Sequence, residues 1–375
     1  MHIFGINFTT NEIISMIITL IILFSIVIWA QSFRKRTYNI IGNRGWFFLL
    51  SVILLVVSVY SLSTKHLNYG LDFTGGTIVQ LGFENTPNTD TMHKELAKYN
   101  PNFSDAAIQL ANKMEEKDAQ NNIKTYQKVL ISVKGEITTP QADPKAKLSS
   151  SKEVENIVTF LKDKYGDIIV YKVEHIGPVI GKELKQKAIV ALLIALFIQL
   201  IYITFRFGTQ MRYGLAADIA LAHDLIIMVG LYSLFGKQAD SPFLAALLTV
   251  VGYSVMDSIV IFDRIRENLK IFKSEKFETI VNISVNQTMT RSINTLLTVL
   301  LTLFALYFFG GETLKNFAFA LLIGVTLGAY SSVFVASPLL VIFDNFLKRN
   351  EQKKIAERRA RLEKEAIEKK QKKSK

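Results

Sequence analysis

The fold of this chain is decided by two apolar stretches, SPFLAALLTVVGYSVMDSIVIF (residues 241–262) and RSINTLLTVLLTLFALYFF (residues 291–309). Each is long enough to cross a bilayer, which takes about 20 predominantly apolar residues in a helix. Each also carries an ionisable residue, Asp257 in the first and Arg291 at the start of the second. A charged group at the centre of a spanning helix costs roughly 2.5–3.5 kcal/mol, and it is tolerated beside a partner, a water-filled cavity or a proton path. The two stretches therefore indicate transport or energy coupling rather than a plain anchor.

Further apolar stretches extend the membrane region. The chain has 375 residues, is 50% hydrophobic and has a mean hydropathy of +0.27. Spanning helices are predicted at 13–33, 46–63, 188–205, 213–235, 241–263, 288–309 and 316–343. This pattern predicts a polytopic α-helical membrane protein with one polar domain. Its parts are an extra N-terminal helix and basic linker (1–45), one helix (46–63), the polar domain (64–187), a five-helix bundle (188–343) and a basic tail (344–375).

Charges in the loops orient the helices. Basic residues crowd the loops on one side, namely Arg34, Lys35, Arg36, Arg44, Arg206, Arg212, Arg264, Arg266, Lys270, Lys273 and Lys276. The opposing loops hold only Lys237 with Asp240 and Lys315 with Glu312, and residues 1–11 contain no Lys or Arg. Because cytoplasmic loops carry an excess of Lys and Arg, the basic side is expected to be cytoplasmic. The N-terminus and residues 64–187 are then outside, in a multi-pass protein of the cytoplasmic membrane.

The C-terminal tail supplies most of the net charge. Residues 345–375 contain 13 Lys/Arg and 5 Asp/Glu, which is +8 of the total +12. The composition favours a solvated cytoplasmic helix with i,i+4 charge pairs, although contact with anionic lipid or ribosomal RNA is an alternative. The basic run has no interleaved aromatic residues, so no specific nucleic-acid partner is expected. The absence of cysteine and the scattered histidines exclude Cys chemistry and predict no metal site.

Residues 64–187 alternate between strand and helix patterns. Strands are predicted at 71–83, 104–111, 126–134 and 167–177, and amphipathic helices at 89–99 and 151–166. The stretches 84–90, 112–125 and 135–150 are expected to be loops. The order β-α-β-β-α-β is that of a ferredoxin-like α+β domain. No catalytic constellation is visible, so the domain is expected to bind an extended polypeptide or a partner, or to act only as a spacer.

Polar residues line one face of each of the two deciding helices. Tyr253, Ser254, Asp257 and Ser258 share a face by their spacing, and so do Thr288, Arg291, Thr295, Thr298 and Thr302. Lipid cannot satisfy such stripes, so they are expected to face each other with Asp257 beside Arg291. A carboxyl group holds its proton more tightly when buried and less tightly near a guanidinium, so an alternating environment makes a proton relay. The alternative is a static buried ion pair.

The helix at 213–235 adds intramembrane polarity. Asp224 is expected near the bilayer centre, with His223 on a different face. These residues are candidates either for interhelical hydrogen bonding or for membership of the relay. Gly324 and Gly328 in the last helix predict close helix packing through a small-xxx-small contact.

Several motifs, in order, resemble those of the SecF family. They are LDFTGGT, HIGPVIGKEL, AHD, GYSVMDSIVIFDRIREN, NQTMTRSINT and FFGGETLKNFAFALLIGVTLGAYSSVFVASP, covering about residues 40–345. The resemblance implies an RND-type helix bundle and a non-enzymatic accessory subunit of the Sec translocon. With its homologue SecD it would use the proton motive force to assist preprotein movement outside the membrane.

The resemblance also assigns residues. Asp257 and Arg291 match the family's functional acid and base, and Asp72, Gly75 and Gly76 match its motif at the start of the outside domain, where glycine gives the backbone freedom. Two features depart from the family. Met256 replaces the usual Asn before the acid, and the helix at 13–33 is extra.

The expected partners follow from the same resemblance. They are SecD as a heterodimer, the SecYEG translocon, unfolded preprotein on the outer side and membrane lipids. No cofactor is expected beyond the coupling ion, which is a proton or a sodium ion. The alternatives are an RND-type exporter of small molecules or lipids, and a structural scaffold for SecD.

Overall fold

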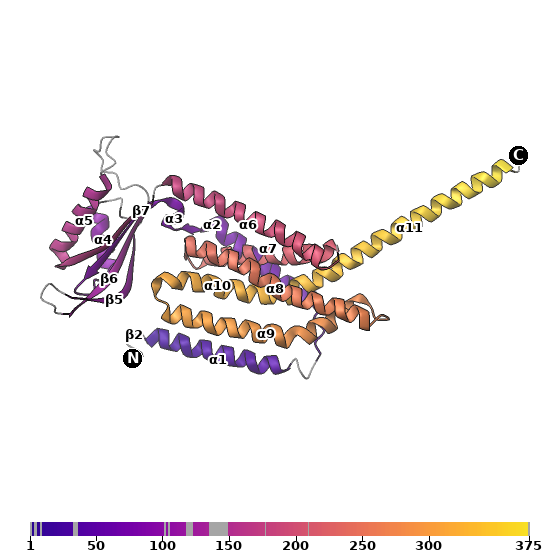
Figure 1. Ribbon diagram of the computed structural model, residues 1–375, viewed down its shortest axis with the longest axis horizontal. Helices are drawn as coiled ribbons and strands as arrows, with labels where there is room; N and C mark the ends of the chain where they lie inside the picture. Colours follow the sequence, from indigo (N-terminus) through magenta and orange to yellow (C-terminus); the bar gives the residue numbers. More distant parts are fainter. Residues whose placement is uncertain are drawn as a thin grey trace.

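The structure is a computed structural model that describes residues 2–3, 6–7, 10–32, 37–100, 103, 106–117, 123–134, 149–176, 178–208 and 210–373. The basic cluster of Arg34, Lys35 and Arg36 lies outside the described residues, as does most of the expected loop at 135–150. In Figure 1 a helix bundle occupies the centre, a sheet domain lies at one end and a single helix extends from the other. We refer to these ends of the bundle as the sheet end and the tail end.

The bundle consists of long helices joined by short turns. They are α1 (Thr10–Ser32), α2 (Arg44–Thr64), α6 (Pro178–Arg206), α7 (Met211–Leu234), α8 (Ser241–Ile271), α9 (Phe277–Phe309), α10 (Glu312–Ser331) and α11 (Ser337–Lys373), with the π-helical segment η2 (Ser332–Ala336) between the last two. Six spans within the described residues are long and apolar enough to cross a membrane, which confirms the polytopic fold. The described apolar part of α1, Ile14–Ile26, is shorter, so its crossing stays a prediction.

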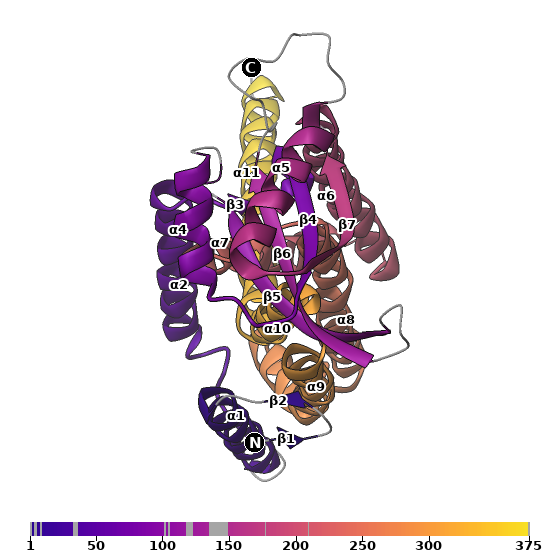
Figure 2. The same cartoon turned by 90° about the vertical axis from the view of Figure 1, so that its left-hand side faces the viewer.

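The extra helix α1 lies along α9 for much of the bundle, as Figures 1 and 2 show from two directions. Its helix length of 23 residues corresponds to about 34 Å at 1.5 Å per residue. Ile17, Ile21 and Phe24 are exposed on its outer side. This apolar outer face is compatible with a lipid environment.

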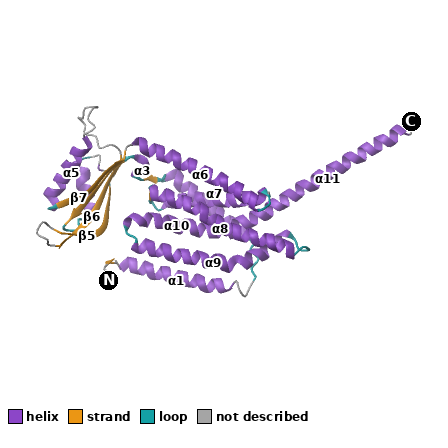
Figure 3. Cartoon of the chain, viewed as in Figure 1, coloured by secondary structure: helices purple, strands orange, loops and turns teal. Residues whose placement is uncertain are grey.

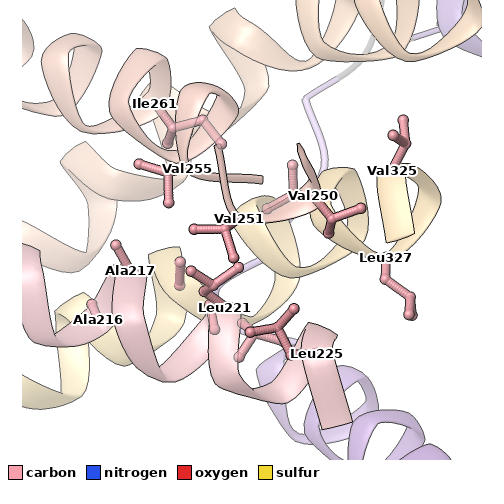
Figure 4. Packing of buried hydrophobic residues seen from close by; sticks show 14 of the residues in the cluster. Ala216, Ala217, Leu221, Leu225, Val250, Val251, Val255, Ile261, Val325 and Leu327 are labelled. Carbon is pink, nitrogen blue, oxygen red and sulfur yellow. The ribbon is translucent and has the colours of Figure 1, made fainter. Parts of the chain in front are cut away.

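The core of the bundle is formed where α7, α8 and α10 meet. Figure 4 shows Leu221 and Leu225 of α7 gathered with Val250 and Val251 of α8, near Val325. Close approach depends on two glycines of α10. A Cβ atom at Gly324 would lie 2.3 Å from a methyl carbon of Val250, and one at Gly328 would lie 3.0 Å from the Cα of Ser254. The small-xxx-small contact predicted for these glycines is confirmed, and α8 is the helix it packs against.

The sheet domain has the predicted β-α-β-β-α-β order (Figure 3). It comprises β4 (Gly76–Phe83), α4 (Thr89–Tyr99), β5 (Ala107–Lys117), β6 (Ile123–Lys134), α5 (Ser149–Tyr165) and β7 (Ile168–Ile176). The four strands are antiparallel in the order β5-β6-β4-β7, as in the ferredoxin-like fold. The expected loop at 112–125 was wrong in part, because β5 and β6 extend into it as a hairpin.

Alternate residues of β4 and β6 build the core of this domain. Val79, Leu81 and Phe83 are buried together with Val129 and Ile131. They pack under Met92 and Leu96 of α4 and under Ile157 and Leu161 of α5. Figure 1 shows both helices on the side of the sheet that points away from the bundle. The period-2 alternation places one sheet face in this core and turns the other towards the bundle.

The two helices of the sheet domain are joined by a polar contact. Glu95 of α4 accepts hydrogen bonds from the Lys164 ammonium at 2.7 Å and from the Tyr165 hydroxyl at 2.9 Å. Lys164 and then Tyr165 lower the pKa of Glu95 from its ordinary 4.5. Burial, followed by the bond to Glu95, raises the pKa of Tyr165 to about 12. At any pH between the ordinary pKa values of Glu95 and Tyr165, Glu95 is therefore ionised, Tyr165 is protonated and the contact is intact.

Candidate functional site

Asp257 lies midway along α8, on the side that faces α9. The hydroxyl of Ser292 donates a hydrogen bond of 2.7 Å to its Oδ1 atom. Its Oδ2 atom is buried and has no hydrogen-bond partner in the described part of the chain. An ionised carboxylate offers about four lone-pair positions, and a protonated one becomes a donor. One fixed donor and one open oxygen therefore leave Asp257 able to bind and release a proton without rebuilding its surroundings.

Asp257 and Arg291 do not form the predicted direct ion pair in the described structure, although the charge of the Arg291 guanidinium acts on the carboxyl group. Arg291 is exposed and makes no hydrogen bond or ion pair with Asp257 among the described residues, and Ser292 occupies the position beside the acid. Successive residues of an α-helix point about 100° apart because one turn takes 3.6 residues. The sequence pattern placed the correct helices together but selected the neighbouring residue of α9.

The other polar residues expected on the α9 stripe do not reach across to α8. Thr295, Thr298 and Thr302 each donate to a carbonyl of their own helix, at 2.8–2.9 Å. A threonine hydroxyl satisfied in this way needs no interhelical partner. Met256, which replaces the family's usual Asn, is about half exposed and points away from the core.

Arg291 lies instead on a polar cavity of about 970 Å³ that opens beside α9. The cavity is lined by Thr37, Asn282, Ile283, Asn286, Gln287, Thr290, Arg291, Asn294 and Thr295. Apart from Thr37 of the linker, these residues lie on α9, most of them in its half nearer the tail end. A guanidinium inside a spanning segment requires water or a partner, and the cavity supplies room for water.

Two asparagines of α9 hold the linker that joins α1 to α2. The side chain of Asn282 accepts from the amides of Ile40 and Ile41 at 2.9 and 3.1 Å. The Asn286 side chain accepts from the Tyr38 amide at 2.8 Å, and both asparagines donate to the Tyr38 carbonyl. We call this set of five hydrogen bonds the asparagine clamp. It fixes the linker as one wall of the cavity that contains Arg291.

Asp224 lies at the centre of the bundle and is fully buried. Its Oδ2 atom accepts hydrogen bonds from Ser254 of α8 at 2.8 Å and from Ser331 of α10 at 2.5 Å. Its Oδ1 atom is 3.0 Å from the Nδ1 atom of His223. We expected His223 to lie on a different face of the helix from Asp224. Its ring nevertheless contacts the Asp224 carboxylate. Three helices, α7, α8 and α10, meet at this one carboxyl group.

Aromatic residues pack beside the Asp224 carboxyl group. The ring of His223 stacks on Tyr330 with centroids 6.4 Å apart, and its Nε2 atom is buried without a hydrogen-bond partner in the described structure. The Tyr330 hydroxyl donates to the Phe47 carbonyl at 2.8 Å and lies 3.2 Å from the Ser51 hydroxyl on α2. Contacts therefore connect α2 to Asp224 in three steps. Hydrogen bonds join α2 to Tyr330, ring stacking joins Tyr330 to His223, and the Nδ1 atom of His223 lies 3.0 Å from Asp224.

The adjacent serines Ser331 and Ser332 were missed in the sequence. The Ser332 hydroxyl donates to the Ser254 carbonyl at 3.1 Å and lies 2.8 Å from the Ser258 hydroxyl. The chain widens into the π-helical segment η2 immediately after Ser331. Such π-turns inside helices occur frequently at functional sites. The doublet of serines beside Tyr330 in an otherwise apolar helix was the available signal.

The motif at the start of the sheet domain connects directly to α8. LDFT forms the short helix α3 (Leu71–Thr74), so the expected strand at 71–83 begins only at Gly76. Gly75 has a φ of 74°, and a Cβ atom at Gly76 would lie 2.1 Å from the Val133 carbonyl oxygen, which explains the glycine pair. Asp72 accepts a hydrogen bond of 2.7 Å from the amide of Ser241, the first residue of α8.

Two further contacts strengthen this connection. The two-residue strands β3 (Asn68–Tyr69) and β8 (Gln238–Ala239) pair in parallel, just before α3 and α8 respectively. Asp240 caps α8 by accepting from the Phe243 amide at 3.0 Å. Burial raises the pKa of Asp240, the Phe243 amide opposes this shift, and the nearby Asp72 adds to it. The start of the sheet domain is therefore fixed to the helix that carries Asp257.

Among the described residues no cluster of three or more His, Cys, Asp or Glu side chains is placed to hold a metal ion. The site consists of isolated carboxyl groups with hydroxyl donors. Chemically, such groups bind and release protons or small cations.

Comparison with known families agrees with the motifs. The profile described as "Protein export membrane protein SecD/SecF, C-terminal" matches residues 156–345, which are 190 of the 375 residues. The profile "SecD/SecF GG Motif" matches residues 60–87, the region of Gly75 and Gly76.

Named relatives are similar over most of the chain. The "Protein translocase subunit SecF" of Thermobaculum terrenum is 39% identical over 316 residues, covering 82% of this chain and 94% of that protein. The one of Sebaldella termitidis is 35% identical, covering 88% and 99%. Their names favour a translocase subunit over the exporter alternative.

Solved structures are similar in fold. The crystal structure of SecDF from Thermus thermophilus, described as a translocon-associated membrane protein, has a TM-score of 0.67 and 33% identity. The super-membrane-facing form of SecDF has a TM-score of 0.61 and 34% identity. This chain corresponds to about two fifths of each SecDF chain, 39% and 40% respectively. The resemblance to an RND-type bundle with a sheet domain is confirmed by these comparisons.

Proposed function

Because this chain belongs to the SecF family of protein translocase subunits, it has a SecF-like accessory role at the Sec translocon, and we propose that it couples the proton motive force to late steps of preprotein translocation. It is a multi-pass protein of the cytoplasmic membrane. SecD and SecF are joined in one chain in the related SecDF, which supports SecD as its partner. We further propose contact with SecYEG, with unfolded preprotein and with membrane lipids. We propose that this role involves no enzymatic step and no cofactor beyond the coupling ion.

The observation that carries the proposal is the environment of Asp257. Its Oδ2 atom is buried and unpartnered at the contact between α8 and α9, and its Oδ1 atom has a single donor, Ser292. The polar cavity containing Arg291 lies on the same helix as that donor. We propose that Asp257 and Arg291 act as the relay, that the tail end with its basic loops is cytoplasmic, and that the N-terminus and sheet domain are outside. Asp224 and His223 are proposed as further members.

The proposed path from proton to movement uses the connection through Asp72. A change in the position of α8 at Asp257 reaches its first residue, Ser241, which Asp72 holds. Moving one charge through 100 mV is worth about 2.3 kcal/mol. That free energy shifts a two-state equilibrium by about fifty-fold, at 1.4 kcal/mol per factor of ten. It is enough to change which position of the sheet domain is favoured.

The test uses the full chain with SecD and the translocon in sealed vesicles. We expect Asp257→Asn to abolish the part of preprotein release that depends on the proton gradient, while copurification with SecD is unchanged. Asp163→Asn is the control for the loss of a carboxylate, because Asp163 is exposed on α5 of the sheet domain, outside the spanning helices. Normal gradient-dependent release by Asp257→Asn would refute the relay and leave the scaffold alternative. Loss of release on replacing sodium with choline would assign sodium as the coupling ion.

A further inference from the structure

An apolar groove of about 530 Å³ lies between the extra helix α1 and the rest of the bundle. Thr19, Ile22 and Ile26 of α1 line one side, and Phe304 of α9 and Leu322 of α10 lie among the residues opposite. Its lining residues belong to α1, α7, α9 and α10, so it lies within the membrane region rather than at a loop. The groove is separate from the Asp257 and Asp224 sites and from the polar cavity of Arg291.

The lining of the groove offers almost nothing to a polar ligand. Its polar side chains are Ser15, Thr19, Tyr307 and Thr326. The Thr326 hydroxyl donates to the Leu322 carbonyl of its own helix at 2.7 Å and is therefore satisfied. A polar ligand would lose its hydrogen bonds to water here and gain few in return. The ligand must be apolar along the length of the groove.

The length and lining of the groove suit an extended acyl chain. From Ser15 to Ile26 the groove runs for about 17 Å, at 1.5 Å per residue of α1. Apolar side chains line most of this length. The hydrocarbon chain of a lipid matches both features.

A cation lies at the mouth of the groove at the sheet end. The Lys237 ammonium is 5.3 Å from the ring centroid of Phe319, which is one of the lining residues. Tyr307 and Phe308 also line this end, as expected for aromatic side chains at the level of lipid headgroups. A lysine at headgroup level attracts an anionic phosphate.

From these observations we propose that the groove binds one acyl chain of an anionic phospholipid whose phosphate lies beside Lys237. The lipid fills the space between α1 and the helices α9 and α10, so α1 is positioned by bound lipid as well as by direct contact with α9. This site is independent of the relay, and the proposal stands without the proposed function.

The test is native mass spectrometry of the purified full chain after exchange into phosphatidylglycerol or phosphatidylcholine. The wild-type chain should retain one phosphatidylglycerol per chain and retain it better than phosphatidylcholine. Ile22→Trp fills the groove and should lose the retained lipid. Ile21→Trp is the matched control, because Ile21 is exposed to a degree similar to Ile22 but does not line the groove, so lipid retention should be unchanged.

The headgroup is tested by Lys237→Gln, which should keep a lipid but lose the preference for phosphatidylglycerol. Circular dichroism and gel filtration establish that each variant is folded. A wild-type chain without retained lipid, or equal retention by Ile22→Trp and Ile21→Trp, would overturn the acyl-chain site. Equal retention of both lipids by the wild type would overturn the headgroup assignment. Retention of a polypeptide in place of lipid would assign the groove to a protein partner and overturn the proposal.

Discussion

Replacing Asn282 by alanine should release the linker between α1 and α2 from α9. Asn282 accepts hydrogen bonds from the amides of Ile40 and Ile41, whose side chains are buried, and donates to the Tyr38 carbonyl. The substitution removes the side-chain acceptor of two backbone amides in a linker whose Ile40 and Ile41 side chains are buried. Each stranded donor costs about 1–3 kcal/mol, so the docked linker should lose about 2–6 kcal/mol relative to the open one.

The assay is hydrogen exchange of the Ile40 and Ile41 amides in the full chain. At 1.4 kcal/mol per factor of ten, the lower bound of about 2 kcal/mol speeds exchange through local opening by about 25-fold. Asn282→Asp keeps an oxygen acceptor for both amides and should show a smaller increase. Asn294→Ala is the matched control, because Asn294 lies on the same helix and lines the same cavity but makes no contact with the linker amides.

Unchanged exchange at Ile40 and Ile41 in Asn282→Ala would show that the clamp does not hold the linker. Faster exchange in Asn294→Ala to the same degree would show that the effect belongs to the cavity as a whole.

Three further substitutions test separate parts of the structure. Gly328→Ala places a Cβ atom against the backbone of α8 and should lower stability to thermal unfolding in detergent by about 1–3 kcal/mol. Gly252→Ala is the control and should not lower it, because no atom lies within 4 Å of a Cβ at that position. Because the pKa of Glu95 is lowered, its stabilising contribution is present above pH 4.5 and is lost as the pH falls through the lowered value. Glu95→Gln should therefore remove part of the acid sensitivity of α4 and α5 in hydrogen exchange, and an unchanged acid profile would contradict this. Ser292→Ala removes the hydrogen bond to Asp257, worth about 1.5–3 kcal/mol for a charged acceptor, and should reduce gradient-dependent release. Thr295→Ala should not, since that hydroxyl is bonded to its own helix.

The sequence predicted the architecture well because both membrane helices and alternating strands have strong periodic signals. The helix at 89–99 matches α4, and the strand order matches the ferredoxin-like domain. The start of that domain was mistaken, because Asp72 and its neighbours read as a strand although they form the helix α3. The four residues before the glycine pair are too few to show whether the segment is a strand or a helix. The packing of α3 against α6 determines that it is a helix.

For the candidate site, the sequence predicted which helices meet but not which side chains contact each other. Spacing placed Asp257 opposite α9, but the choice between Arg291 and Ser292 depends on helix rotation, which a polar stripe specifies only to within about one residue. The clamp lay beyond prediction, since Asn282 and Ile40 are 242 residues apart and no local pattern connects them. Ser331, which donates to Asp224, and Ser332, which donates to the Ser254 carbonyl, were missed for the same reason, because their partners are on other helices.

The contacts divide the bundle into two groups of helices that meet at Asp257. Asp224 joins α7, α8 and α10 through its serine donors, and Gly328 holds α10 against α8. On the other side, the asparagine clamp and the contact with α1 tie the linker to α9. The bond from Ser292 to Asp257 crosses between the groups within the membrane region. Nearer the tail end, Asn268 and Arg264 of α8 make further hydrogen bonds to Ser284 and Gln287 of α9. A proton arriving at Asp257 therefore acts where the two groups separate, whereas a proton at Asp224 acts inside one of them. If this division is correct, Ser292→Ala should impair coupling, whereas Gly328→Ala should lower stability without impairing coupling. Equal effects of both substitutions on both measurements would mean that the bundle behaves as one body.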